Sequence, residues 1–127
     1  MNNRVELIHA HGCHVIQHYH GQIKLILPDF LEMGPDGLHT IEAPPIGDCT
    51  FSEAFAVTGD RMALIGNVDC GHLLPCGAPD DVRAAVRQCL RDAAPGGGYV
   101  LSTACSVPPG APPENVRALR AAAEPSS

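Results

Sequence analysis

The 127-residue sequence has no tryptophan, few other aromatic residues and no long apolar run. Because aromatic residues make up only 4% of the chain, the core must be built from Val, Leu, Ile and Ala. No segment approaches the roughly 20 apolar residues that a membrane-spanning helix needs. The first residues are interrupted by polar side chains and do not resemble a signal peptide, so we expect no membrane association.

Positive charge is also scarce and is not clustered anywhere. Eight Lys and Arg stand against 14 Asp and Glu, which gives a formal net charge of −6. A binding surface for nucleic acid or for an anionic membrane needs concentrated positive charge. The sequence therefore indicates a small-molecule substrate instead of a nucleic acid.

Six cysteines are present, but no two of them are spaced as Cys-x-x-Cys. Zinc ribbons and zinc fingers use that spacing, so neither is expected. The cysteine spacings match no small disulfide-bonded scaffold, and the element pattern described next is typical of cytoplasmic α/β proteins. We therefore predict a cytoplasmic protein without a disulfide framework.

What the sequence does contain is a regular alternation of apolar strands with amphipathic helices. The predicted strands are residues 13–19, 38–42, 62–68 and 99–105. The predicted helices are residues 3–11, 22–33 (kinked or split at Pro28), 51–58, 79–93 and 114–123. Strands of near-continuous apolar character that alternate with helices predict a parallel sheet covered by helices.

Two histidines and a distant cysteine lie at the ends of two of these strands. His18 and His20 project to the same face, because side chains alternate along a strand. Cys105 ends the last strand. We predict that the three side chains meet at one metal site. The alternative is that the histidines are hydrogen-bonded core residues and the cysteine is a small apolar filler.

Three protein ligands with an open fourth position are typical of a catalytic zinc, which lowers the pKa of a bound thiol or water. Glu42, Asn67 and Asp69 also lie at strand ends. We predict that Glu42 and Asp69 are catalytic, either by orienting a ligating imidazole or by contacting substrate. Asn67 is predicted to bind the cofactor. The alternatives are loop-facing carboxylates and an asparagine that fixes a loop.

Four other histidines and cysteines receive structural assignments. His39, on the same predicted strand as Glu42, is predicted to be a packing residue. His72, Cys70 and Cys76 lie in the connection after residues 62–68. This connection is predicted to be a loop, although its three side chains could alternatively form an accessory site.

Five segments, in this order, resemble a known family. They are His18-Tyr19-His20-Gly21, Ile41-Glu42-Ala43-Pro44-Pro45, Ile65-Gly66-Asn67-Val68-Asp69, Gly97-Gly98-Tyr99-Val100-Leu101-Ser102 and Pro112-Pro113-Glu114-Asn115-Val116. They are similar to the C-terminal half of the uroporphyrinogen decarboxylase superfamily, which also holds zinc-dependent methyltransferases that act with corrinoid proteins on thiols. The resemblance implies one partial domain over residues 1–127, made of the last four strand–helix units of a (β/α)8 TIM barrel.

The methyltransferase branch resembles this chain in its strand-borne His-x-Cys-Gly pair and its late cysteine, which are its zinc ligands. Carried over to this sequence, the resemblance assigns His18, His20 and Cys105 to zinc. His20 departs from the usual cysteine, which removes one thiolate and makes the ion a stronger Lewis acid. The decarboxylase branch lacks the histidine pair, and its catalytic Asp and Arg belong to the other half of the barrel.

The resemblance implies zinc-dependent methyl transfer from a corrinoid or methylated donor to a thiol, with a corrinoid protein as partner. Two alternatives stay open: a uroporphyrinogen decarboxylase of porphyrin biosynthesis, and a non-catalytic half-barrel subunit or fragment. A free half barrel exposes two sheet edges and its inner face. We therefore expect a homodimer, a complementary N-terminal half barrel, or a longer enzyme to which the chain belongs.

Overall fold

The computed structural model describes residues 4–93 and 96–125 and is built on a four-stranded parallel sheet. The strands follow each other in the order β1-β2-β3-β4. They are β1 (Ile16–His18), β2 (Gly37–His39), β3 (Ala63–Val68) and β4 (Tyr99–Thr103). The predicted parallel sheet is thus confirmed, and its sequential order is that of four consecutive units of a (β/α)8 barrel.

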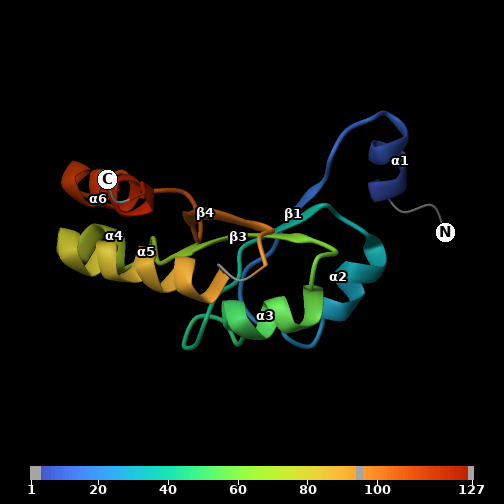
Figure 1. Ribbon diagram of the computed structural model, residues 1–127, viewed down its shortest axis with the longest axis horizontal. Helices are drawn as coiled ribbons and strands as arrows, with labels where there is room; N and C mark the ends of the chain where they lie inside the picture. Colours follow the sequence, from blue (N-terminus) through green and yellow to red (C-terminus); the bar gives the residue numbers. More distant parts are fainter. Residues whose placement is uncertain (1–3, 94–95, 126–127) are drawn as a thin grey trace.

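Helices precede, connect and follow the strands (Figure 1). They are α1 (Arg4–Ala10), α2 (Leu27–Met33), α3 (Phe51–Thr58), α4 (Leu73–Cys76), α5 (Pro79–Ala93) and α6 (Pro113–Ala123). In Figure 1 the strands cross the middle of the molecule, with α3 below them, α2 towards one end and α4, α5 and α6 towards the other. The two termini lie at opposite ends.

One face of the sheet packs against the helices. Leu38 on β2 and Leu64 on β3 are partners in the sheet register, and both are completely buried. They belong to a core cluster with α2, α3 and the adjoining loops: Ile23, Leu27, Phe30, Leu38, Ile41, Cys49, Phe51, Ala54, Met62 and Leu64. Two smaller clusters, around Val68 and Leu74, join β3 to α4, α5 and α6.

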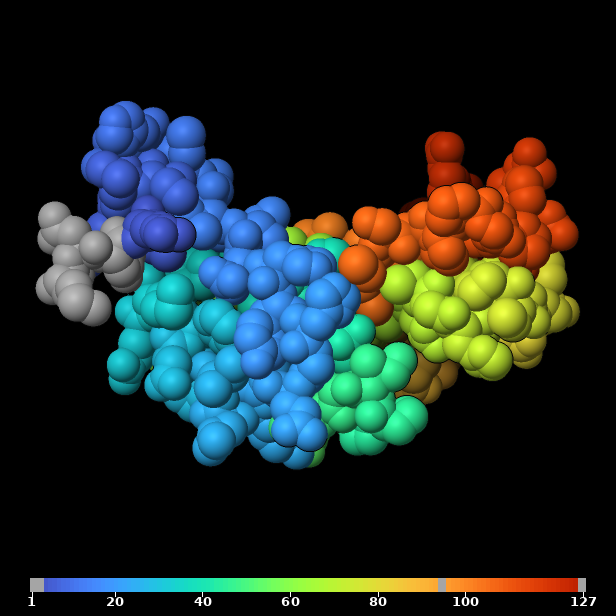
Figure 2. Space-filling model, turned by 180° about the vertical axis from the view of Figure 1, so that it is seen from behind, coloured from blue at the N-terminus to red at the C-terminus, as the bar shows by residue number. Residues whose placement is uncertain are grey.

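The opposite face of the sheet is largely open. Ile16 on β1 is 61% exposed and Val100 on β4 is 52% exposed. The register places Val100 in line with Ile65 and His39, so these side chains share this face. Figure 2 shows the molecule hollowed along one edge, between the N-terminal segment and the C-terminal helix. A closed barrel fills this inner face with side chains from all of its strands.

Several predicted boundaries need correction. The bounds of α3 and α5 are as predicted, but the helix predicted over residues 22–33 begins only at Leu27. Pro28 opens this helix instead of kinking it, because the first turn has no hydrogen bond for a proline to remove. β2 ends at His39 and β4 at Thr103, so Glu42 and Cys105 follow their strands instead of lying within them.

Helix α4 lies in the connection predicted to be a loop. Its Leu74 is completely buried against α5 and α6. The side-chain amide of Asn115, on α6, donates to the carbonyl oxygens of Leu74 and Gly77, both at 2.8 Å. This short helix therefore depends on a distant residue, which local sequence does not reveal. Asn3, the predicted start of the first helix, and Pro95, which follows the helix predicted over residues 79–93, lie outside the described residues.

Helix α3 begins with a capping box. The Thr50 hydroxyl accepts from the backbone N–H of Glu53, and the Glu53 carboxylate accepts from the backbone N–H of Thr50. Glu53 also pairs with Lys24 at 2.7 Å. The bond from Lys24, followed by the bond from Thr50, lowers the pKa of Glu53 from 4.5 to about 2.

The low pKa of Glu53 predicts that stability will depend on pH. A carboxyl group with a depressed folded-state pKa stabilises the fold above its unfolded pKa and loses this contribution as the pH falls. Wild type should therefore be more stable than Glu53→Gln at neutral pH, and the difference should disappear between about pH 4.5 and about pH 2. Urea unfolding of both proteins across this range measures the difference. A constant difference would contradict the prediction.

Two further findings bear on the expected environment of the protein. Within the described residues, no helix combines the length and the apolar character needed to cross a bilayer. All six cysteines are free thiols in the structure.

Candidate metal centre

The structure brings together the three side chains predicted to bind metal. His18 ends β1, His20 lies just beyond it, and Cys105 lies just beyond β4. One ligand atom from each residue lies within 4.8 Å of the other two. Both imidazoles are exposed and Cys105 is half-buried, so a ligand can reach the cluster from solvent.

This convergence depends on the curvature of the sheet. β1 and β4 are its two edge strands, separated by β2 and β3. In a flat sheet, strands three places apart would be about 14 Å from each other. The shorter distance requires strands that curl as they do in a barrel. His20 and Cys105 also lie beyond the last paired residues of their strands, where the chain turns away from the regular sheet direction.

The two histidines belong to a longer row of polar side chains, which we call the imidazole chain (His39, His18 and His20). The Nδ1 atoms of His39 and His18 are 2.9 Å apart, and the Nε2 atoms of His18 and His20 are also 2.9 Å apart. At the far end, His39 Nε2 lies 2.9 Å from the carbonyl oxygen of Thr103. His39 is therefore a polar neighbour of the site, not only a packing residue. Its register position beside His18 is the signal that sequence reasoning missed.

Glu42 contacts His20, at the other end of the imidazole chain. Its carboxylate lies 3.2 Å from His20 Nδ1 and accepts from the backbone N–H of Gly21 at 2.8 Å. The Glu42 side chain is only 12% exposed, whereas that of His20 is 45% exposed. The carboxylate is thus placed to orient the His20 ring, which is one of the two roles predicted for it.

The surroundings favour neutral imidazole at His18. Partial burial is the largest cause that lowers the pKa of His18, followed by the neighbouring His39 and His20 rings. The Glu42 carboxylate opposes this shift and only partly offsets it. Neutral imidazole is the form that binds metal ions.

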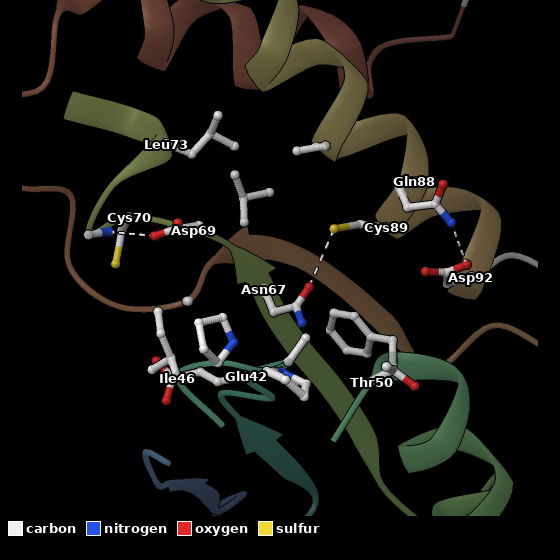
Figure 3. A pocket seen from close by; sticks show the side chains of 18 residues that line it. Glu42, Ile46, Thr50, Asn67, Asp69, Cys70, Leu73, Gln88, Cys89 and Asp92 are labelled. Carbon is white, nitrogen blue, oxygen red and sulfur yellow. Dashed lines mark hydrogen bonds between the residues drawn. The ribbon is translucent and has the colours of Figure 1, made fainter. Parts of the chain in front are cut away.

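Asp69 and Asn67 line the adjoining cavity and make contacts outside the cluster (Figure 3). The Asp69 carboxylate accepts from the backbone N–H groups of Gly71 and His72, at 2.8 and 3.1 Å, and so fixes the loop after β3. The Asn67 amide donates to the carbonyl oxygen of Ile41 at 2.5 Å. This bond fits the alternative that the sequence offered for Asn67, fixing a loop, because Ile41 lies in the connection after β2.

A cavity of about 460 Å³ adjoins the site through Glu42 (Figure 3). Its volume lies within the range of small-molecule sites. Among the described residues that line it, none is basic and most are apolar. Its lining residues include Glu42, Ile46, Asn67, Asp69, Cys70 and Cys89.

The remaining candidates do not join the cluster. Within the described part of the chain, His18, His20 and Cys105 form the single group with metal-binding spacing. Cys70 lies beside Cys105, and burial is the main cause that raises the pKa of its thiol. His72 and Cys76 are exposed and form no accessory site within residues 4–93 and 96–125.

Comparison with known proteins identifies the family. The sequence model of the family described as uroporphyrinogen decarboxylase (URO-D) matches residues 1–125. The chain belongs to the uroporphyrinogen decarboxylase family. The family predicted from the five segments is therefore confirmed.

The curated relatives of this family member include both branches. The chain is 36% identical over 107 residues to a methylcobamide:CoM methyltransferase of Methanosarcina barkeri. The aligned residues are 84% of this chain and 29% of that protein. It is 32% identical to a methylated-thiol–coenzyme M methyltransferase of Methanosarcina mazei, over 84% of this chain and 26% of that protein. A uroporphyrinogen decarboxylase of Thioalkalivibrio sulfidiphilus is 42% identical over 67 residues, which are 53% of this chain and 18% of that protein.

A solved structure supports the same relationship. A methyltransferase from Methanosarcina mazei superposes with a TM-score of 0.72 and 32% identity, over 84% of this chain and 29% of that one. The predicted fold, a half barrel with a parallel sheet, is thus confirmed. The chain spans less than a third of the length of these relatives.

Proposed function

We propose that this chain carries the zinc-binding part of a methyltransferase site, which transfers a methyl group from a corrinoid or methylated donor to a thiol. The observation that carries the proposal is the convergence of His18, His20 and Cys105, whose ligand atoms lie within 4.8 Å of one another. The methyltransferase relatives match 84% of the chain, whereas the decarboxylase relative matches 53%. This difference supports the methyltransferase branch.

The residues present fit zinc. Two imidazole nitrogens and one thiolate sulfur are a common ligand set for this ion, and three protein ligands leave a position for substrate. The exposure of His18 and His20 allows a fourth ligand to approach. A zinc ion held there would lower the pKa of a bound thiol and so supply a thiolate nucleophile near neutral pH.

The neighbouring residues have distinct proposed roles. Glu42 orients the His20 ring through its contact with Nδ1, as partner carboxylates of metal-bound histidines do. Asp69 fixes the loop beside the site, and Asn67 joins β3 to Ile41, so both shape the cavity that adjoins Glu42. In this proposal the cavity admits the small-molecule substrate, and a corrinoid protein presents the methyl group.

The rest of the barrel is proposed to cover the inner face of the sheet. Ile16 and Val100 on that face are 61% and 52% exposed, and β1 and β4 are sheet edges. Unpaired edge strands favour pairing with further strands. We propose that an N-terminal half barrel, in the same polypeptide or in a partner, or a second copy of this chain, completes the domain in the cytoplasm.

The 42% identity to a uroporphyrinogen decarboxylase over 67 residues keeps decarboxylation as a second candidate. A non-catalytic subunit that binds a partner is a third. Zinc would be required only in the methyltransferase reading, so metal content separates it from the decarboxylase reading. Measured turnover by the completed barrel would exclude the third.

Metal analysis of purified protein tests the proposal. We expect about one zinc per chain in wild type, because three protein ligands suffice for a tetrahedral site with one open position. His18→Ala and Cys105→Ala should each lose the ion. His72→Ala is a matched control, because this exposed histidine lies outside the cluster, and it should keep the ion. Wild-type protein without zinc after dialysis against the metal, or equal loss in all three variants, would refute the proposal.

A further inference from the structure

His39 makes polar contacts through both of its ring nitrogens. Its Nε2 lies 2.9 Å from the Thr103 carbonyl oxygen, and its Nδ1 lies 2.9 Å from Nδ1 of His18. A carbonyl oxygen can only accept a hydrogen bond, so His39 Nε2 must carry a hydrogen. In a neutral imidazole the other nitrogen is then an acceptor. His39 Nδ1 therefore presents a lone pair to His18.

This lone pair fixes the tautomer of His18. The hydrogen between the two Nδ1 atoms must belong to His18, which leaves the lone pair of His18 on Nε2. At the other end of the imidazole chain, the Glu42 carboxylate can likewise only accept a hydrogen bond, so the ring hydrogen of His20 lies on Nδ1. The lone pair of His20 is therefore on Nε2 as well.

The two lone pairs face each other. His18 Nε2 and His20 Nε2 are 2.9 Å apart, and with three neutral rings neither nitrogen has a hydrogen to give the other. Two acceptors in contact repel, and a cation bound to both removes the repulsion. The imidazole chain thus points the Nε2 lone pairs of His18 and His20 at the same place. The Thr103 carbonyl oxygen fixes the tautomers from one end of the imidazole chain, and the Glu42 carboxylate fixes them from the other.

Resting on the zinc site proposed above, we propose that His39 is a positioning residue that selects Nε2 of His18 as the zinc ligand. The second bond of His39, to the Thr103 carbonyl oxygen, also connects it to the region of the third zinc ligand, Cys105. Thr103 ends β4, and its hydroxyl donates to the carbonyl oxygen of Cys105. His39 on β2 therefore ties the His18 side of the site to the segment of β4 that leads into Cys105.

Two substitutions separate the two bonds of His39. In His39→Asn, the side-chain oxygen occupies roughly the place of Nδ1 and can still accept from His18, but the bond to Thr103 is lost. In His39→Gln, the amide nitrogen reaches roughly the place of Nε2 and can still donate to Thr103, but the acceptor for His18 is lost. The two variants have similar polarity, and each keeps one of the two bonds.

The first readout is the tautomer of His18 in the metal-free 127-residue chain. Nitrogen-15 NMR, at a pH at which the rings are neutral, distinguishes a protonated ring nitrogen from an unprotonated one, and His18→Ala assigns the signals. We expect the hydrogen on Nδ1 in wild type and in His39→Asn, and a shift towards Nε2 in His39→Gln. A hydrogen on Nε2 of His18 in wild type would overturn the proposal without any variant.

The second readout is zinc affinity, measured by competition with a chromophoric chelator. His39→Gln should bind zinc about 10–100-fold more weakly, as when a second-shell partner is lost, whereas His39→Asn should keep the affinity of wild type. The reverse order would show that His39 acts only as a strand tie, and equal affinities would show that it has no role. If wild type binds no zinc, the proposed function fails, while the tautomer measurement still decides the role of His39.

Discussion

Truncation of Leu64 to alanine is expected to lower the free energy of unfolding by about 2–5 kcal/mol. Leu64, on β3, is completely buried beside the equally buried Leu38. Its side chain contributes to the cluster that joins the sheet to α2 and α3. Alanine would lose the burial of the removed carbons and leave a cavity that the surrounding strands and helices cannot fill completely.

Leu25→Ala is a matched control for this substitution. Leu25 is 90% exposed, so the same chemical change should alter the free energy of unfolding by no more than about 0.5 kcal/mol. Urea titrations followed by circular dichroism measure both variants. Equal effects of the two substitutions would show that the sheet does not pack on α2 and α3 as described.

Gly47→Ala should have the second large effect, because it would force the backbone next to Glu42 to move. A Cβ atom at Gly47 would lie 2.0 Å from the Glu42 carbonyl oxygen and 2.8 Å from Glu42 Cβ. Gly47 also donates to the Ala43 carbonyl oxygen at 3.1 Å, so the loop cannot simply swing away. Overpacking of this kind typically costs about 1–3 kcal/mol.

The same substitution should weaken zinc binding. Movement of Glu42 would take its carboxylate away from His20 Nδ1, and loss of such a partner typically lowers metal affinity about 10–100-fold. Gly110→Ala is the control, because no atom lies within 4 Å of a Cβ at that position. Thermal unfolding and chelator competition measure both effects. If Gly47→Ala matched Gly110→Ala in both, the described loop would be wrong.

The sequence predicted the bounds of helices whose ends are stabilised by residues within or next to the helix itself. α5 begins at Pro79, with Asp80 and Asp81 in its first turn, and Thr50 and Glu53 cap α3. These groups satisfy the free N–H groups of a first turn or interact favourably with the helix dipole. The bounds of both helices could therefore be predicted from the sequence.

Elements that depend on distant contacts could not be predicted in this way. The Asn115 side chain satisfies carbonyl groups at α4 from α6, far along the chain. The apolar pattern before Leu27 suggested a longer helix, but Ile23 and Lys24 donate their backbone N–H groups to the Asp48 carboxylate instead. A competing partner from another loop thus delays the start of the helix to Leu27.

The candidate site, too, could be predicted only in part from the sequence. Strand alternation placed His18 and His20 on one face, and the position of Cys105 at the end of the last predicted strand added it to the site. The sequence did not reveal that His39 would be in contact with His18, since His39 was assigned to packing. That contact depends on the register between β1 and β2.

The sequence by itself determined the order of strands and helices, the parallel sheet and the residue types at the strand ends, because periodicity and helix capping act over a few neighbouring residues. Only the tertiary structure decided that the ends of β1 and β4 approach each other and that a hydrogen-bonded chain runs from Thr103 to Glu42. The physical reason is that sheet curvature and strand register arise from packing between segments far apart in the chain.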